Sequence, residues 1–185
     1  MTTAIIGTGG LGSVIGRQLA SGGETLRLSS ANHESAQRLA AKIGPAAVVA
    51  VDNRDALQGA DAVVLALRFT VLKAVVDQIA DPLTDKIVVV PSNPLTVDAG
   101  ACLAMAFGTL SGDLFESSSN RSPERAVLFY ATDDDHAGQE VERLIRTAGF
   151  EPVKVGGIEQ SGRLEVGGDL HDLVVGIAEA QSLID

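Results

Sequence analysis

Three glycines near the start of the chain, Gly7, Gly9 and Gly12, have the spacing G-x-G-x-x-G. They follow a short apolar run, and a helical pattern comes after them. In this context the first glycine permits a tight turn, the second lets a pyrophosphate approach the backbone, and the third lets the helix pack close to the strand. The helix N-terminus adds free amides and partial positive charge. We therefore expect a dinucleotide to bind here, the alternative being a turn with a purely structural role.

The end of the second apolar run distinguishes NADP from NAD. Proteins that bind a free ribose 2'-hydroxyl usually carry an Asp or Glu there, about twenty residues beyond the glycines. This chain has "LSSAN" instead, so Ser29 and Ser30 can donate hydrogen bonds to a 2'-phosphate that no carboxylate repels. The pattern favours NADP(H). Ser29, Ser30 and Asn32 could also cap the following helix.

The elements that must position these residues alternate along the first half of the chain. Asn32 and Thr70 are the expected caps of two of the helices. The expected strands are residues 3–7, 25–29, 46–51, 61–67 and 86–90. Such apolar strands, separated by helices, are typical of a parallel sheet covered on both faces. We expect a Rossmann-like, doubly wound α/β fold with a mostly parallel sheet and a small C-terminal α/β extension.

Beyond Pro91 the alternation becomes less regular. The polar segment 111–125 is expected to be an exposed, mobile loop. The tail 156–185 is expected to be mostly helical, with an apolar stripe packed against a second subunit of a homodimer. The further expected strands are residues 101–107, 126–131 and 151–156. We expect a single domain, 1–185, made of a dinucleotide-binding core at about 1–95 and a smaller acceptor-side extension at about 96–185.

Composition narrows the class of partner. The formal net charge is −10 with 14 Lys and Arg, which argues against a nucleic-acid partner because phosphate neutralisation needs a basic face. The one cysteine, Cys102, excludes an intramolecular disulfide and a CxxC metal site, and it fits a reducing compartment. No stretch reaches the roughly 18 apolar residues of a membrane span. We expect a cytoplasmic protein that does not bind a membrane.

Residues able to act as acids, bases or metal ligands are few and scattered. His33, His136 and His171 form no recognisable triad with a nucleophile. The segment "TDDDH" at residues 132–136 could suggest a metal site, but acidic residues at a helix start are more simply a cap with favourable dipole charges. We expect no metal and no catalytic side chain.

Several segments together resemble the NADPH-dependent reductases of the deazaflavin coenzyme F420. They are "IIGTGGLGS", "DAVVLAL", "KIVVVPSNPL", "AFGTL", "TDDDHAGQEVERLIRTAGFEPVKVGG" and "GRLE". The resemblance extends from Met1 to about Glu165. It implies a small C-terminal part beside a Rossmann sheet, with hydride passing directly between NADPH and F420 bound between them. Such transfer needs proximity and orientation and no protein nucleophile.

The resemblance also implies roles for individual residues. Ser29 and Ser30 would hold the 2'-phosphate. The pyrophosphate would lie against the glycine turn, on Gly7, Thr8, Gly9, Gly10, Leu11 and Gly12. The adenine or ribose would be flanked by Leu67, Arg68 and Phe69, and the nicotinamide approached by Ser92, Asn93 and Pro94. The small-molecule redox acceptor would be bordered by Phe107, Gly108 and Thr109.

The chain departs from the family around "AFGT". The family often has a Lys, and an Asn or His, where this chain has Met105 and Gly108. Other acceptors therefore stay open: a flavin, a quinone or a ferric chelate, as does a sensor that binds NADP(H) without turnover. The "GRLE" segment offers Arg163 and Glu165, which could contact a substrate or only order the turn.

Overall fold

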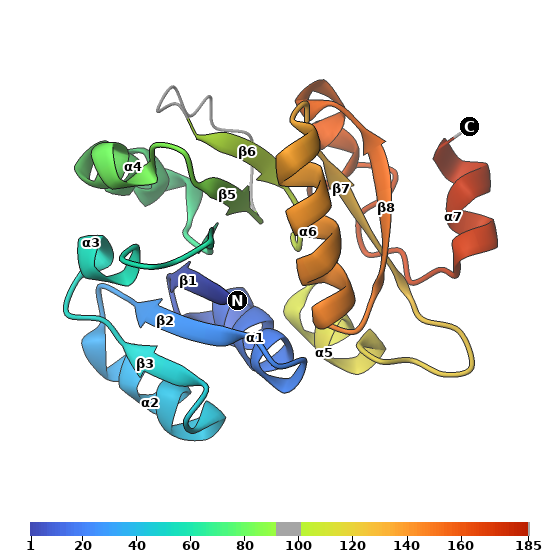
Figure 1. The fold of residues 1–185 in the computed structure, drawn as a ribbon. Helices are drawn as coiled ribbons and strands as arrows, with labels where there is room; N and C mark the ends of the chain where they lie inside the picture. The colour runs from blue at the N-terminus through green and yellow to red at the C-terminus, as the bar shows by residue number, and fades with distance from the viewer. Residues whose placement is uncertain (92–100, 185) are drawn as a thin grey trace.

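The computed structural model describes residues 1–91 and 101–184. They form one eight-stranded sheet in the order β3-β2-β1-β4-β5-β6-β7-β8 (Figure 1). Its strands are β1 (Thr2–Ile6), β2 (Thr25–Ser29), β3 (Ala47–Val49), β4 (Ala62–Leu65), β5 (Ile87–Val90), β6 (Cys102–Met105), β7 (Val127–Ala131) and β8 (Glu151–Gly156). The helices are α1 (Gly10–Ser21), α2 (His33–Ile43), α3 (Asn53–Ala56), α4 (Phe69–Leu83), α5 (Gly112–Ser118), α6 (Asp135–Thr147), the 3₁₀ helix η1 (Ile158–Arg163) and α7 (Ile177–Ile184).

Strand direction divides the sheet into two blocks. From β3 across to β6 every neighbouring pair is parallel. β7 then pairs antiparallel with β6 through Met105 and Ala131, and β8 runs parallel to β7. All residues of β4 and β5 are buried, as strands covered on both faces must be. The expected Rossmann-like α/β fold with a mostly parallel sheet is confirmed.

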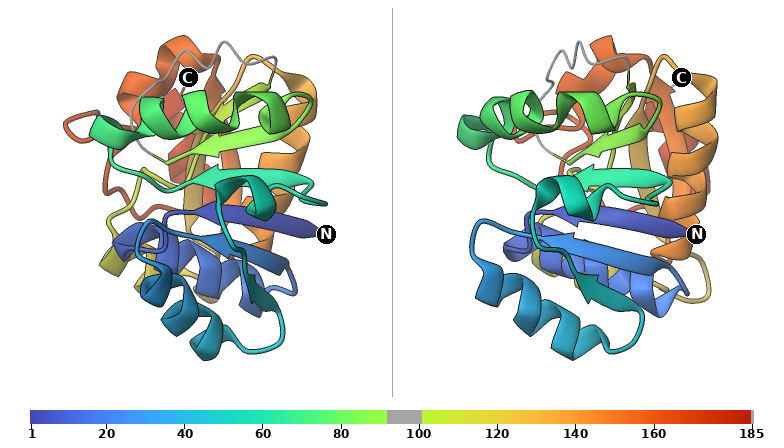
Figure 2. Two further views of the ribbon diagram at one scale, coloured as in Figure 1. Left: turned by 90° about the vertical axis from the view of Figure 1, so that its left-hand side faces the viewer. Right: turned by 60° about the vertical axis from the view of Figure 1, so that its left-hand side comes forward.

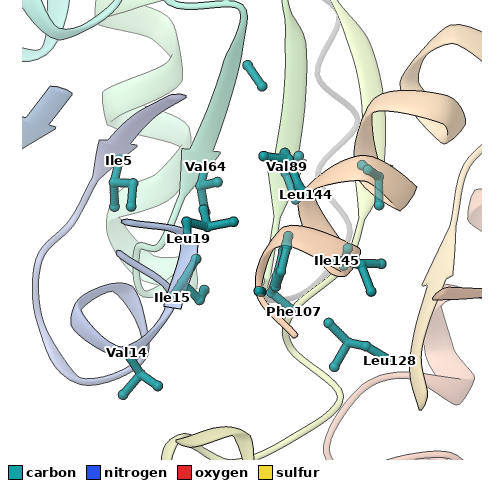
Figure 3. Packing of buried hydrophobic residues seen from close by; sticks show 14 of the residues in the cluster. Ile5, Val14, Ile15, Leu19, Val64, Val89, Phe107, Leu128, Leu144 and Ile145 are labelled. Atoms are coloured by element: carbon teal, nitrogen blue, oxygen red, sulfur yellow. The ribbon is translucent and has the colours of Figure 1, made fainter. Parts of the chain in front are cut away.

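Helices cover both faces of the sheet (Figure 2). On one face, α1, α2, α5 and α6 contribute buried apolar side chains such as Ile15, Leu39 and Leu144, and Figure 3 shows Ile15, Leu19, Leu144 and Ile145 in this layer. On the other face, α3, α4 and α7 contribute residues such as Leu72 and Ala180. This burial follows the helical spacing of the apolar residues in the sequence.

The structure corrects the expected loop at 111–125. Residues Gly112–Ser118 form α5, and the fully buried Phe115 packs its ring 4.7 Å, centroid to centroid, from the ring of Phe150. Phe115 anchors this short polar helix on the core, because a buried Phe removes a large apolar area from water. Leu114 packs against the same core, and Glu116 forms an ion pair with Arg17 of α1 at 2.9 Å.

Two smaller expectations are also wrong. Only Ile177–Ile184 of the tail is α-helical, and Val175 and Ala180 of its apolar stripe are buried in this chain's own core. Helix α4 begins at Phe69 with Arg68 before it and has no side-chain cap, so Thr70 is not the cap. The expected homodimer stays a prediction.

A buried ionic cluster joins the start of β2 to α6. The guanidinium of Arg143 donates to the carboxylate of Glu24 at 2.8 Å and to that of Glu140 at 2.6 Å. Only 2% of the Glu24 side chain is exposed, and its carboxylate also accepts from the Thr3 hydroxyl at 2.8 Å. Two desolvated carboxylates thus share one cation, which connects the first half of the chain to the second.

We expect Arg143→Met to lower the free energy of unfolding by about 3–5 kcal/mol, because it leaves two buried carboxylates without their cation. The matched control is Arg146→Met on the same helix. The Arg146–Glu142 pair has side chains 49% and 36% exposed, so its loss should cost less than about 1 kcal/mol. Equilibrium unfolding in urea measures both variants, and equal losses would contradict the role given to Arg143.

Candidate functional site

A cavity of about 940 Å³ opens at the carboxyl ends of the parallel strands. It lies where β1 is flanked by β2 on one side and β4 on the other, which is the switch point where open α/β sheets bind ligands. Its wall comes from the turn after β1, the ends of β2, β3 and β4, and the first turns of α4. The lining includes Gly7, Gly9, Gly10, Leu11, Gly12, Ser29, Ser30, Leu67, Arg68 and Pro91.

Two of the glycines are required by the close packing of the turn. Gly7 has φ +101°, and a Cβ there would collide with the carbonyl oxygen of Ala66 at the end of β4. A Cβ on Gly12 would collide with the carbonyl oxygen of Gly7. Any side chain at either position would therefore push α1 away from β1 and β4.

Gly9 and Gly10 differ from these two because a Cβ on either would meet no atom within 4 Å. Both line the large cavity, and Gly9, which precedes α1, supplies no side-chain cap to the helix. Because Gly9 and Gly10 have no side chains, a ligand in the cavity can reach the backbone amides of the first turn of α1. This is the cradle that a pyrophosphate fits, so the residues present suit a dinucleotide.

The two serines after β2 have different environments. The buried Ser29 donates its hydroxyl hydrogen to the side-chain oxygen of Asn53 at 2.7 Å. Ser30 lines the cavity. The helix cap is instead Asn32, whose side chain accepts from the amide of Ser35, so neither serine caps α2. Asp52 also lines this end of the cavity.

Thr8 faces a second, smaller cavity of about 230 Å³ between α1 and α2. Its hydroxyl donates to that of Ser35 at 3.0 Å. Three cationic side chains, Arg17, Arg38 and Lys42, line this cavity, which also shares Gly9 and Gly10 with the large one. Thr8 therefore lines this smaller cavity, whereas Ser29 and Ser30 line the large one.

The side of the large cavity next to α4 is formed partly by residues that the sequence reasoning missed. Val71, Val75 and Gln78 of α4 line it together with Leu67 and Arg68. Their spacing of four and three residues is that of one helix face, a signal that was available in the sequence. The Phe69 side chain is 57% exposed and does not belong to the lining.

The residues expected near the nicotinamide and the acceptor fall into separate groups. Ser92, Asn93 and Pro94 lie outside the described residues. Phe107 is fully buried, and Figure 3 shows it among the core side chains close to Leu144 and Ile145. Its backbone has φ +69°, and its ring centroid lies 6.0 Å from that of Phe115. The expectation that Phe107 borders an acceptor is therefore corrected, because its ring belongs to the core.

Gly108 and Thr109 lie beside Pro91. A Cβ on Gly108 would collide with the Pro91 carbonyl, which explains why a glycine stands there. Thr109, Glu165 and Pro91 line a small cavity of about 10 Å³, roughly the size of one water molecule. Thr109 Oγ1 and Glu165 Oε1 are buried and have no hydrogen-bond partner within residues 1–91 and 101–184. Because an unpaired buried polar atom costs free energy, a water molecule that donates to these two oxygens would stabilise the recess.

Within the described residues, no helix is both long and apolar enough to cross a membrane.

Several solved structures have a similar fold. A hypothetical protein from Sinorhizobium meliloti is 26% identical, with a TM-score of 0.84 over 95% of each chain. A candidate F420-dependent NADP reductase from Arthrobacter sp. FB24 is 19% identical, with a TM-score of 0.70 over 86% of each chain. An imine reductase from Myxococcus stipitatus in complex with NADP⁺ is 19% identical, with a TM-score of 0.67 over 84% of this chain and 55% of that one. The last two likenesses establish the fold alone.

The stretch that carries the cavity also carries the family relationship. Curated protein sequences contain no significant match to this chain. Residues 2–94, about half of the chain, match the family described as NADP oxidoreductase, coenzyme F420-dependent. This stretch runs from β1 through β5 and includes the glycine turn, both serines and the end of β4. The chain therefore belongs to the F420-dependent NADP oxidoreductase family and is an NADP-dependent oxidoreductase.

Proposed function

We propose that the protein transfers a hydride directly between NADPH and a flat redox-active ring, with coenzyme F420 as the preferred acceptor. The observation that carries the proposal is the bare-backbone cradle at Gly9 and Gly10 in a cavity that ends at Pro91. Pro91 also lines the small cavity with the unpartnered polar atoms of Thr109 and Glu165. Pro91 thus borders both the large cavity and a polar recess about the size of one water molecule, and we place the acceptor on this side of the large cavity.

Different parts of the wall of the large cavity would hold different parts of NADPH. The amides at the start of α1 would face the pyrophosphate, where the partial positive charge of the helix favours an anion. Ser30 would donate to the 2'-phosphate, and the Arg68 guanidinium adds positive charge to the lining. Val71 and Val75 would supply an apolar surface for the adenine. NADPH bound in this way would supply the hydride.

The chain's part in the transfer is to hold two rings together and exclude water. Effective molarities in well-oriented reactions account for about 7–11 kcal/mol of a barrier, so no protein nucleophile is needed. Thr109 and Glu165 line the water-sized recess beside Pro91, from which a held water molecule would hydrogen-bond the polar edge of the acceptor. His171 lies next to Asp172, with Nδ1 3.5 Å from the carboxylate, and takes no part in this scheme.

We expect Gly9→Val to abolish NADPH binding and leave the fold intact, because the new side chain fills ligand space and meets no protein atom within 4 Å of its Cβ. The matched control is Gly162→Val, since a Cβ at Gly162 also meets nothing within 4 Å and Gly162 does not line the large cavity. Fluorescence titration with NADPH and a thermal melt test both variants. Normal NADPH binding by Gly9→Val would show that the turn is only structural.

We expect the wild-type protein to bind NADPH more tightly than NADH, and Ser30→Asp to reverse that order. The new carboxylate repels the 2'-phosphate and accepts a hydrogen bond from a free ribose hydroxyl, so NADPH affinity should fall by about tenfold or more. Ser30→Asn, similar in size but uncharged, separates charge from shape. Equal wild-type affinities for the two nucleotides would refute the predicted preference.

The proposed function is tested by following deuterium from NADPH labelled on one face of the nicotinamide. We expect the label on reduced F420 with no exchange with solvent, because the hydride passes between two rings in contact. Flavins, quinones and ferric chelates are assayed in parallel. If one of these is reduced faster than F420, that compound is the preferred acceptor and the proposal of F420 is wrong. NADPH binding without oxidation by any acceptor would indicate a sensor.

The steady-state rate of NADPH oxidation tests where the acceptor binds. Glu165→Gln should raise the KM for the acceptor severalfold and leave the Kd for NADPH unchanged, because Glu165 lines the small cavity and is not among the described residues that line the large one. A change in NADPH affinity with unchanged acceptor KM would place the acceptor elsewhere.

A further inference from the structure

A second group of chemically reactive side chains lies at the amino-terminal end of β6. The large cavity opens at the other end of the parallel strands, where the strands end. Cys102 begins β6, and Asp134 and His136 stand at the start of α6. The Cys102 sulfur, an Asp134 oxygen and a His136 ring nitrogen all lie within 4.8 Å of one another. Met105, which lines the small cavity beside Pro91, is three residues, or about 10 Å, further along β6.

Hydrogen bonds fix these groups relative to one another. The Thr132 hydroxyl donates to the carbonyl of Leu103 at 2.7 Å and accepts from the amide of Asp134 at 3.2 Å, which ties the turn before α6 to β6. The Asp134 carboxylate caps α6 by accepting from the amide of Ala137 at 2.7 Å. These backbone and helix-cap hydrogen bonds therefore hold Asp134 near Cys102 without the help of a ligand.

The charges around the three side chains decide whether a cation can enter. The Asp134 carboxylate lies within 4.8 Å of both the Cys102 sulfur and the His136 ring. The partial positive charge at the start of α6 opposes a cation, but Asp133, Asp134 and Asp135 in the same turn offset it.

We propose that Cys102, Asp134 and His136 bind a divalent transition-metal ion of the zinc class, with solvent completing its coordination. One thiolate, one imidazole and one carboxylate are all ligands that zinc accepts, whereas Mg²⁺ and Ca²⁺ bind oxygen ligands. Binding replaces the thiol proton, which leaves to solvent, and joins β6 to α6. The ion lies away from the dinucleotide cavity, so the proposal is independent of hydride transfer.

Cobalt provides the test, because Co²⁺ bound to a thiolate gives a charge-transfer absorption that nitrogen and oxygen ligands do not. Cys102 is the only cysteine, so such a band from the untagged full-length protein can arise only there. We expect the band on addition of Co²⁺, its loss on addition of Zn²⁺, and none in Cys102→Ser. Zinc affinity is measured by competition with a chromogenic chelator.

Two further variants and a control complete the experiment. His136→Gln and Asp134→Asn should each weaken zinc binding by about 10- to 100-fold, and Asn retains the helix cap. The control is His33→Gln, an exposed histidine at the start of α2, which should leave zinc affinity unchanged. NADPH binding checks that every variant is folded. Absence of the thiolate band, or equal zinc affinity in Cys102→Ser and the wild type, would overturn the proposal.

Discussion

The close approach of the turn after β1 to the end of β4 is the constraint on which the site depends. Gly7 and Gly12 leave no room for a Cβ against Ala66 and the turn's own carbonyl. Because the backbone can come this close, α1 starts directly at the sheet edge and its first amides face the cavity. Parallel pairing then sets Ile6 level with Ser29 and Leu65, so the segments that follow three strands meet around one ligand-sized space.

The second half of the chain reaches this space by a different route. β7 and β8 are antiparallel to the other strands. The turn between β7 and α6 therefore lies at the end of the sheet away from the large cavity. After β8, the 3₁₀ helix η1 returns the chain to Leu164 and Glu165, which lie beside Pro91. Arg143 holds α6 against Glu24 at the start of β2. Because the desolvation cost of such a pair offsets much of its attraction, its net contribution to stability is smaller than the loss expected when Arg143 alone is removed.

Sequence patterns predicted the sheet well and the site in part. Continuous apolar runs identified the strands because burial on both faces leaves one strong signal, and the glycine spacing located the turn. Helix α5 was missed because only Phe115 and Leu114 of its seven residues are large and apolar, and the polar residues around them are typical of a loop. Phe107 was misplaced because a positive φ redirects its side chain, and composition carries no information about that. Cys102 comes close to residues 134–136 because β6 pairs with β7, about thirty positions later in the chain. The spacing of residues in the sequence does not show which strands pair, so this proximity could not be predicted.

The junction between the two blocks of the sheet has a consequence for how such a chain can diverge. β6 and β7 pair through Met105 and Ala131 alone, whereas the neighbouring pairs have three to five partners. Few backbone hydrogen bonds cross that boundary, so substitutions in β7 and β8 can shift the second block without moving the glycine turn. The family match ends at residue 94, before that boundary. The stretch that the family model recognises therefore lies wholly within the parallel block, which carries the large cavity.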